Sequence, residues 1–231
     1  MNNYFVILAA GKGKRFNKSK PKQFYNYKNK EIIDHSIEKS LNSKLFKKII
    51  VVTNNLTYFK KKKYSKLISI IKGGKERSDS SLLAIKYLKK FKPKNVLIHD
   101  AARPDFSIKL LRKLIIHLKS NQAVVPFIYS RDAVKYKVKN MVFNLDQEKV
   151  FLTQTPQAFR YKNLYELSIK QKNKITDESS LFFDNHKKIK FIKGENNNKK
   201  ITYKSDVELG KTYFGIGFDI HRLIKNKKLY L

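Results

Sequence analysis

Cysteine is absent from the 231 residues, which excludes disulfide bonds, thiolate nucleophiles and thiolate metal ligands. No apolar run approaches the roughly 20 residues that a membrane-spanning helix needs. The N-terminal segment also lacks the charged region that opens a secretory signal. From these absences we expect no association with a membrane and a location in a reducing compartment, the cytoplasm.

Acidic residues are scarce as well, with 18 Asp and Glu against 52 Lys and Arg and a formal net charge of +34. Such an excess invites a nucleic-acid-binding interpretation, because clustered basic side chains neutralise phosphates. Only seven of these residues are arginine, the lysines are scattered, and no helix-turn-helix, zinc-finger or RNP pattern occurs. A basic nucleic-acid-binding protein without catalysis therefore stays as an alternative, with no specific nucleic-acid partner expected under the main hypothesis.

The remaining sequence is typical of an α/β protein, with 41% hydrophobic residues and alternating strand-like and helix-like segments. Strands are predicted at 4–8, 49–53, 95–99 and, more weakly, 67–71. Helices are predicted at 80–91 and after Ser107, which can cap a helix that carries Leu111, Leu114, Ile115 and Leu118 on one face. This pattern predicts a doubly wound, mainly parallel sheet, whose ligands bind at the carboxyl ends of the strands.

Residues 132–153 do not follow this alternation of strand-like and helix-like segments. The segments 133–138 and 141–145 alternate in hydrophobicity around Lys139 and Asn140, and this alternation predicts a protruding β-hairpin. A second irregular segment, 187–200, is rich in Lys and Asn and is predicted to be a loop.

The most informative stretch is 8–16, LAAGKGKRF, which follows the apolar strand at 4–8. Gly11 and Gly13 let the backbone turn and come close to a ligand, with amide groups free to face phosphate oxygens. Arg15 and Lys22 add positive charge. Phe16 stands where a dinucleotide fingerprint needs its third glycine, and the Gly-Lys-Ser/Thr of a P-loop is missing. An ordinary strand-to-helix turn is the other interpretation of so short a motif.

The wider context resembles the sugar-phosphate nucleotidyltransferases, and more narrowly the 2-C-methyl-D-erythritol 4-phosphate cytidylyltransferase family of the non-mevalonate isoprenoid pathway. The stretch 8–15 and Pro21-Lys22-Gln23 carry the first part of the resemblance. The other parts follow in order: GGKERSDS at 73–80, HDAARP at 99–104, TPQAF at 155–159, ITDE at 175–178 and KKIT at 199–202. Together these motifs are far more specific than any one of them.

This resemblance implies a Rossmann-like nucleotidyltransferase fold, with the arm at about 132–153 joining two chains into a homodimer. It also implies that methylerythritol phosphate attacks the α-phosphorus of CTP and releases pyrophosphate, with Mg²⁺ on the triphosphate. A phosphate monoester is already anionic near neutral pH, since its second pKa is about 6, so no general base is required. Arg15 and Lys22 match the residues that stabilise the transition state.

The same residue-by-residue match implies the substrate contacts. Ala9, Ala10, Gly74 and Ser80 fall where the family holds cytosine, beside the glycines Gly11 and Gly13, and Asp100 falls near the ribose. The residues that face the methylerythritol phosphate are Arg103, Thr155, Thr176 and Lys200. Two local alternatives stay open, because Asp100 could be a plain ion-pair partner of Arg103 and Thr176 could belong to an ordinary helix start.

Three positions depart from the family pattern. Gln147 stands where the family has an Arg that grips the substrate phosphate from the neighbouring subunit, and a neutral amide lacks that bidentate, charge-assisted contact. Ala133 replaces a Thr and Lys75 replaces an acidic residue. The changes at Gln147 and Ala133 favour an alternative within the same enzyme class, a cytidylyltransferase for another polyol phosphate such as ribitol 5-phosphate.

The last segment, GIGFDIHRL at 215–223, resembles the start of 2-C-methyl-D-erythritol 2,4-cyclodiphosphate synthase, which is fused to the cytidylyltransferase in some bacteria. That resemblance implies a divalent-metal role for Asp219 and His221, which share one face if the segment is a strand. A zinc site needs at least three protein ligands, so we expect weak zinc binding and no cyclase activity. The predicted division is a cytidylyltransferase domain at 1–214 and an incomplete synthase domain at 215–231.

Overall fold

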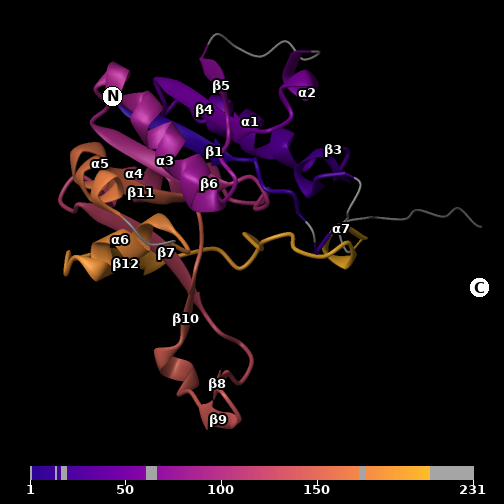
Figure 1. Cartoon of the computed structure of the whole chain (residues 1–231), viewed down its shortest axis with the longest axis vertical. Helices are drawn as coiled ribbons and strands as arrows, with labels where there is room; N and C mark the ends of the chain where they lie inside the picture. Colours follow the sequence, from indigo (N-terminus) through magenta and orange to yellow (C-terminus); the bar gives the residue numbers. More distant parts are fainter. Residues whose placement is uncertain (1, 14, 17–19, 61–66, 172–174, 209–231) are drawn as a thin grey trace, which may run out of the picture.

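The computed structural model describes residues 2–13, 15–16, 20–60, 67–171 and 175–208, which form a three-layer α/β unit (Figure 1). Its central sheet has eight strands in the order β10-β7-β11-β6-β1-β4-β5, with β12 paired to β7. The strands are β1 (Asn3–Leu8), β4 (Lys48–Thr53), β5 (Ile68–Lys72), β6 (Asn95–Asp100), β7 (Ala123–Tyr129), β10 (Phe151–Thr153), β11 (Gln157–Arg160) and β12 (Lys190–Lys193).

Parallel pairing dominates this sheet, as the apolar runs predict. β1 pairs in parallel with β4 and β6, and β4 pairs in parallel with β5. β11 runs antiparallel between β6 and β7, and β10 is antiparallel to β7. Leu8 lies opposite both Val52 and Asp100, so the loops that follow β1, β4 and β6 leave the same edge of the sheet.

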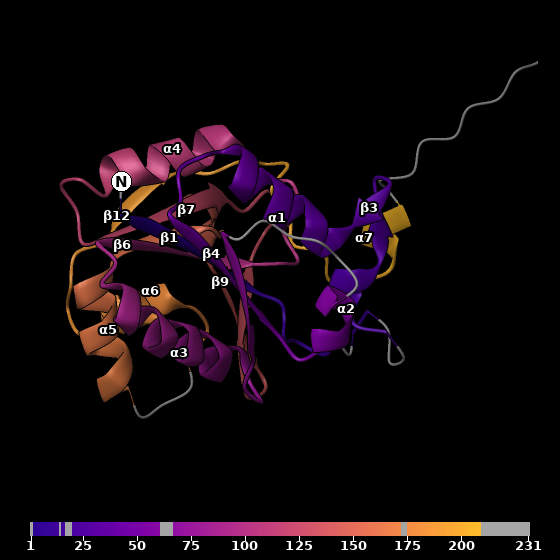
Figure 2. The same cartoon turned by 90° about the horizontal axis from the view of Figure 1, so that it is seen from above.

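Helices cover both faces of the sheet (Figure 2). The helices α1 (Ile32–Asn42) and α4 (Ile108–His117) lie on one face, and α3 (Arg77–Leu88), α5 (Tyr161–Lys170) and α6 (Glu178–Asp184) lie on the other. Alternation along β1 explains the two cores: Phe5 and Ile7 pack with the first pair of helices, whereas Tyr4, Val6 and Leu8 pack with the second group. The doubly wound fold is therefore confirmed.

Shorter elements complete the described chain. They are β2 (Asn26–Tyr27), β3 (Lys30–Glu31), α2 (Leu56–Lys60), α7 (Ser205–Glu208) and three 3₁₀ turns at Lys22–Phe24, Lys89–Phe91 and Gln147–Lys149. Within these described residues, the helices are too short or too polar to cross a membrane.

The predicted hairpin is present as β8 (Lys135–Val138) and β9 (Met141–Asn144), which pair antiparallel around Lys139 with its positive φ of 50°. It lies at the end of an arm that leaves the sheet between β7 and β10 (Figure 1). All eight residues of the two strands are exposed. The strands are shorter than the alternation in the sequence suggested.

Two local predictions need correction. The predicted loop at 187–200 contains β12, because an edge of β7 was open for parallel pairing with 190–193. The predicted helix at 80–91 begins at Arg77, because Glu76 and Asp79 form a capping box, and its last three residues adopt a 3₁₀ turn. The prediction for Ser107 is confirmed, since its side chain accepts a hydrogen bond from the Leu110 amide at the start of α4.

Candidate active site

A cavity of about 1010 Å³ opens at the carboxyl ends of β1, β4 and β6. This is the edge at which parallel α/β sheets bind ligands. Ten of the residues singled out in the sequence line it: Ala9, Ala10, Gly11, Gly13, Arg15, Lys22, Gly74, Ser80, Asp100 and Lys200. The fold thus brings the motifs at 8–15, 73–80, 99–104 and 199–202 to one place.

The loop after β1 is shaped by one glycine and one glutamine. Gly13 has a φ of 62°, which L side chains rarely adopt, and a Cβ there would lie 3.3 Å from the Lys22 Cγ. The Gln23 side chain donates hydrogen bonds to the carbonyl oxygens of Ala9 at 2.6 Å and Gly11 at 3.1 Å. A Cβ on Gly11 would meet no atom of the described residues within 4 Å, so the space beside this residue belongs to the cavity.

The second loop, which follows β5, is packed against the first. A Cβ on Gly73 would lie 2.3 Å from the Ala10 Cβ, and one on Gly74 would lie 2.3 Å from the Asp79 Cβ. The buried hydroxyl of Ser80 accepts a hydrogen bond from the Gly74 amide and donates to the Glu76 carbonyl oxygen. Both glycines are therefore required by close packing, and the Ser80 side chain holds the loop in shape.

Among the described residues, the lining carries seven Lys or Arg side chains and two carboxylates, so this part of the cavity is strongly positive. Lys22 is half-buried, and its ammonium donates to the Ile201 carbonyl oxygen at 2.5 Å. Burial, together with the nearby cations Lys200 and Arg15, lowers the pKa of Lys22 to about 8, although Asp100 opposes the shift. A polyanion entering the cavity would relieve this crowding of positive charge.

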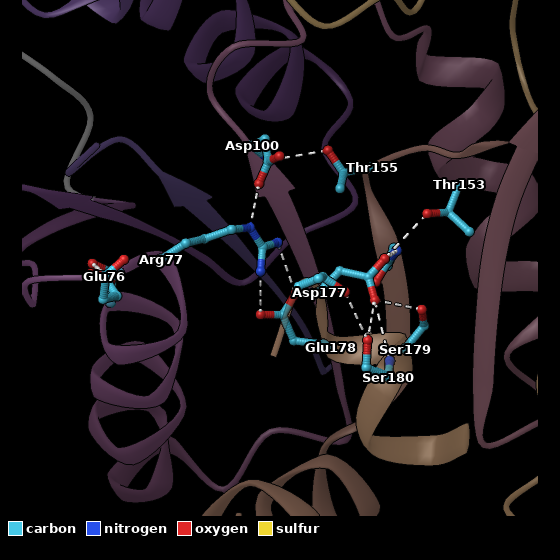
Figure 3. A network of polar contacts seen from close by, with 12 residues as sticks. Glu76, Arg77, Asp100, Thr153, Thr155, Asp177, Glu178, Ser179 and Ser180 are labelled. Atoms are coloured by element: carbon cyan, nitrogen blue, oxygen red, sulfur yellow. Dashed lines mark hydrogen bonds and ion pairs between the residues drawn. The ribbon is translucent and has the colours of Figure 1, made fainter. Parts of the chain in front are cut away.

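Asp100 lies at the end of β6 and is held from three sides, by Lys200 and by the two residues Arg77 and Thr155 that Figure 3 labels beside it. Its two carboxylate oxygens accept hydrogen bonds from Arg77 Nε at 2.9 Å and Lys200 Nζ at 2.8 Å, and its amide donates to the Thr155 hydroxyl. Burial opposes ionisation, yet Arg77 and Lys200 hold the pKa of Asp100 well below its usual range. The alternative interpretation of Asp100 as a plain ion-pair partner of Arg103 is therefore wrong.

Arg103 instead donates to two backbone carbonyl oxygens, those of Asn198 at 2.9 Å and Thr153 at 3.3 Å. Burial lowers the pKa of Arg103, and its Nε has no hydrogen-bond partner within the described part of the chain. The side chain thereby fixes the segment that leads to Lys200 and does not line the cavity.

Thr155 and His99 form a buried pair behind Asp100. The Thr155 hydroxyl lies 3.1 Å from His99 Nδ1, and His99 Nε2 lies 3.2 Å from the Ser36 hydroxyl. His99 is 0% exposed, and burial lowers the pKa of its imidazole to about 3, so the ring is neutral. Both side chains support the end of β6 and neither lines the cavity.

Thr176 lies at the start of α6, where the alternative interpretation as a helix start is confirmed. Asp177 is the N-cap and accepts a hydrogen bond from the Ser180 amide, and Thr176 is exposed with its hydroxyl 3.0 Å from that of Ser180. The next residue, Glu178, is fully buried and receives both terminal nitrogens of Arg77 at 2.9 and 3.0 Å (Figure 3). The sequence motif therefore contributes a buried carboxylate as well as a cap.

Gln147 lies outside the cavity, in the exposed 3₁₀ turn of the arm, where its side chain donates to the Ser130 carbonyl oxygen at 3.0 Å. The metal ligands expected at Asp219 and His221 lie outside the described residues. Within the described residues, no group of three or more His, Asp or Glu could hold a metal ion.

Sequence reasoning missed three residues that organise the site: Gln23, Arg77 and Glu178. All three lie inside the motifs that carry the family resemblance, so the motifs marked them as candidates. A motif does not show, however, which side chains will contact one another in the folded protein. Arg77 and Glu178 are 101 positions apart, and only the packing of α3 beside α6 brings them together.

Comparison with known proteins supports the family resemblance. The family model described as 2-C-methyl-D-erythritol 4-phosphate cytidylyltransferase matches residues 4–215. A bifunctional enzyme IspD/IspF of Pelagibacter ubique is 51% identical across the whole chain, which spans 63% of that relative's length. A 2-C-methyl-D-erythritol 4-phosphate cytidylyltransferase of Thermosipho melanesiensis is 37% identical over 90% of the chain and 95% of its own length.

Solved structures agree with the sequence relatives. The crystal structure of 4-diphosphocytidyl-2C-methyl-D-erythritol synthase from Anaerococcus prevotii matches with a TM-score of 0.80 at 28% identity, over 90% of this chain and 93% of that one. The bifunctional IspDF of Campylobacter jejuni matches with a TM-score of 0.78 at 31% identity, over 90% of this chain and 54% of that one.

Proposed function

The chain belongs to the 2-C-methyl-D-erythritol 4-phosphate cytidylyltransferase family, and from this premise we propose that it transfers the cytidylyl group of CTP to 2-C-methyl-D-erythritol 4-phosphate. The observation that carries the proposal is the convergence of the glycine loop, the segment at 73–80, Asp100 and Lys200 around one basic cavity. The products are 4-diphosphocytidyl-2-C-methyl-D-erythritol and pyrophosphate.

The reaction is a displacement at the α-phosphorus of CTP. An oxygen of the acceptor phosphate forms a bond to this phosphorus, and the bond to the bridging oxygen of the β-phosphate breaks, so pyrophosphate leaves with the electron pair. The acceptor is ionised at neutral pH, because the second pKa of a phosphate monoester is about 6, and needs no general base. The buried, neutral His99 and the ion-paired Asp100 fit a site that does not move protons.

What the reaction needs from the protein is alignment and positive charge on the oxygens that gain charge. We assign this role to Arg15 and Lys22, which line the cavity beside the glycine loop. Amides of the loop that contains Gly11 and Gly13 would bind triphosphate oxygens. Ala9, Ala10, Gly74 and Ser80 would enclose the cytosine, because small residues and backbone groups leave an edge-on slot of limited width.

The acceptor side is assigned to Lys200 and the segments next to it. Lys200 is half-exposed and lines the cavity, and its ammonium is oriented by Asp100. The family resemblance assigns Thr176 to the acceptor as well; this residue is exposed at the start of α6 and does not line the cavity. Arg103 and Thr155 act on the acceptor only through the backbone and Asp100, because neither side chain lines the cavity.

Mg²⁺ would enter with CTP. The two carboxylates that line the described part of the cavity are both engaged, Asp100 by Arg77 and Lys200 and Glu76 by the capping box of α3. The donor set therefore fits a Mg²⁺ ion that is held by triphosphate oxygens and water, as this small cation often is. Bound in this way, the ion would supply charge neutralisation on the leaving pyrophosphate.

The arm is the proposed homodimer contact. Its exposed large apolar side chains include Tyr136, Met141, Val142, Phe143 and Leu145, an unusual density for a solvent-facing hairpin. A second copy of the chain would cover this surface and place Gln147 beside the neighbouring acceptor site. Light scattering coupled to size-exclusion chromatography should report a dimer for the wild type and a monomer for Phe143→Asp, whereas a monomeric wild type would contradict the proposal.

The domain division is also a proposal. We assign 1–214 to the cytidylyltransferase domain, in line with the family match at 4–215, and 215–231 to a segment that resembles the start of the synthase. Alignment of the whole chain with a bifunctional relative supports this division. A cytoplasmic location fits the absence of cysteine.

The central experiment measures pyrophosphate release with CTP, Mg²⁺ and methylerythritol phosphate, and repeats it with ATP, GTP and UTP. We expect activity that favours CTP over the purine nucleotides. Ribitol 5-phosphate is the second acceptor to test, because Gln147 and Ala133 depart from the family pattern. Turnover with ribitol 5-phosphate and none with methylerythritol phosphate would show that ribitol 5-phosphate is the acceptor.

A further inference from the structure

Arg77, the first residue of α3, connects the start of this helix with both Asp100 and α6 (Figure 3). Its Nε donates to one oxygen of Asp100, and its two terminal nitrogens donate to the two oxygens of Glu178. We propose that Arg77 and Glu178 are positioning residues, which fix the carboxylate of Asp100 and through it the ammonium of Lys200 for the transfer reaction. The inference rests on the proposed function of the cavity.

Asp100 needs such support because its terminal torsion is soft. The rotation of an aspartate carboxylate is broad and roughly two-fold, and the contact of Thr155 fixes only the backbone amide. Arg77 holds Oδ1 at 2.9 Å, so Oδ2 must face Lys200, which it binds at 2.8 Å. Without Arg77 the carboxylate would turn, and the long Lys200 side chain would lose the hydrogen bond that orients it.

Glu178 in turn fixes Arg77. A bidentate pair with a carboxylate sets the plane of a guanidinium and therefore the direction of its Nε–H bond. Glu178 is 0% exposed and occupies the first position of α6. The cap of that helix is itself fixed, because Asp177 accepts hydrogen bonds from Thr153, Gln157 and Ser179.

Stability alone does not require this arrangement. Taking two charges out of water is costly, and buried ion pairs can often be replaced by apolar residues of similar volume without loss of stability. Removal of a single partner does destabilise the fold, since it leaves the other charge unpaired in the interior. A variant that replaces both charges with apolar residues can therefore test the positioning role without unfolding the protein.

The test is the double variant Arg77→Met/Glu178→Leu, compared with wild type and with the control Arg112→Met/Glu166→Leu. The control exchanges the same residue types at exposed positions outside the cavity. We expect the double variant to unfold near the wild-type temperature but to lose about 10- to 100-fold in kcat, the scale for misplacing a reacting group. A kcat within twofold of the control would overturn the inference.

Arg77→Lys covers the case in which the double variant does not fold. It keeps the positive charge but cannot hold Glu178 and Asp100 together in fixed directions. Here we expect a lower kcat with a smaller change in the KM for CTP, and unchanged kinetics would overturn the inference.

A readout without turnover separates this inference from the proposed function. Site-resolved mass spectrometry after brief treatment with an amine-reactive reagent measures the accessibility of the Lys200 ammonium, with exposed Lys119 as internal reference. We expect faster labelling of Lys200 in the double variant, and equal rates would contradict the positioning role. An inactive wild type would defeat the proposed function, while the labelling result would still decide this one.

Discussion

The ammonium of Lys22 donates a hydrogen bond of 2.5 Å to the carbonyl oxygen of Ile201, 179 positions further along the chain. This contact places Lys22 beside Lys200, so cations from the two ends of the sequence meet at one wall of the cavity. Because the two ammonium groups repel each other, the site is under electrostatic strain that a bound polyanion would relieve.

Lys22→Ala should lower kcat by roughly 10² to 10³, or about 3 to 4 kcal/mol, the scale for removing one preorganised group that meets developing charge. Pyrophosphate release measures the effect, and thermal unfolding shows whether the variant is intact. Lys113→Ala, an exposed lysine on α4 outside the cavity, is the matched control. Near-normal turnover of Lys22→Ala would refute the assigned role.

The lowered pKa of Lys22 predicts a pH dependence of CTP binding. The protonated form binds the triphosphate, so affinity should fall as pH rises through about 8, in a range where the terminal phosphate, with a pKa of about 6, is already ionised. Calorimetric titration between pH 7.5 and 9.5 would measure it. Lys22→Arg keeps its charge throughout and should bind CTP without this dependence; a parallel decline in both proteins would point to another group.

The same shift predicts a small gain in stability at alkaline pH. Between about pH 8 and the ordinary lysine pKa, the unfolded chain holds a proton on Lys22 that the folded chain has released, so the free energy of unfolding rises with pH. Below pH 8 both states carry the proton, so the free energy of unfolding is lowered by the full cost of holding charged Lys22 in its half-buried site. Denaturant unfolding of wild type against Lys22→Ala should show this contribution only in the wild type.

Gly11→Ala and Gly13→Ala form a matched pair that separates binding from folding. Gly13 has a φ of 62°, so alanine there should cost about 1 to 2 kcal/mol in the free energy of unfolding. A Cβ at Gly11 would have no atom of the described chain within 4 Å, so this variant should keep its melting temperature and raise the KM for CTP. A normal KM in a stable Gly11→Ala protein would show that the nucleotide does not approach this loop.

Gln147→Arg is predicted to gain function. A guanidinium would add a charge-assisted contact to the acceptor phosphate of about 1.5 to 3 kcal/mol, so the KM for that substrate should fall more than the KM for CTP. Gln147→Lys adds the charge without the bidentate geometry and should give a smaller effect. If the KM of the arginine variant is unchanged or higher, another residue already binds the phosphate.

Several features could be predicted because they depend on residues close together in sequence. The run 4–8 forms β1, the Ser107 hydroxyl caps α4 as its sequence position suggests, and the alternation around Lys139 produces a hairpin. In each of these the local pattern of apolar residues, turn residues or capping groups already selects the structure.

Other features could not be predicted, because their causes lie far away in the chain. The segment at 190–193 is a strand only because β7 offers a free edge, and its Lys- and Asn-rich surroundings predicted a loop. Asp100 has Arg103 three residues away, yet its partners are Arg77 and Lys200, 23 and 100 positions distant. Nearness in sequence was the wrong guide to this ion pair.

The sequence by itself determined the strand-loop-helix units, the glycine loop and the motifs that resemble a cytidylyltransferase, because each depends on contiguous residues and their period. Only the tertiary structure decided which charged groups meet. The orientation of Lys200 through Asp100, the buried pair of Arg77 and Glu178, and the contact between Lys22 and Ile201 all arise where separate segments converge at one edge of the sheet. Such contacts depend on the packing of whole layers, which no local pattern specifies.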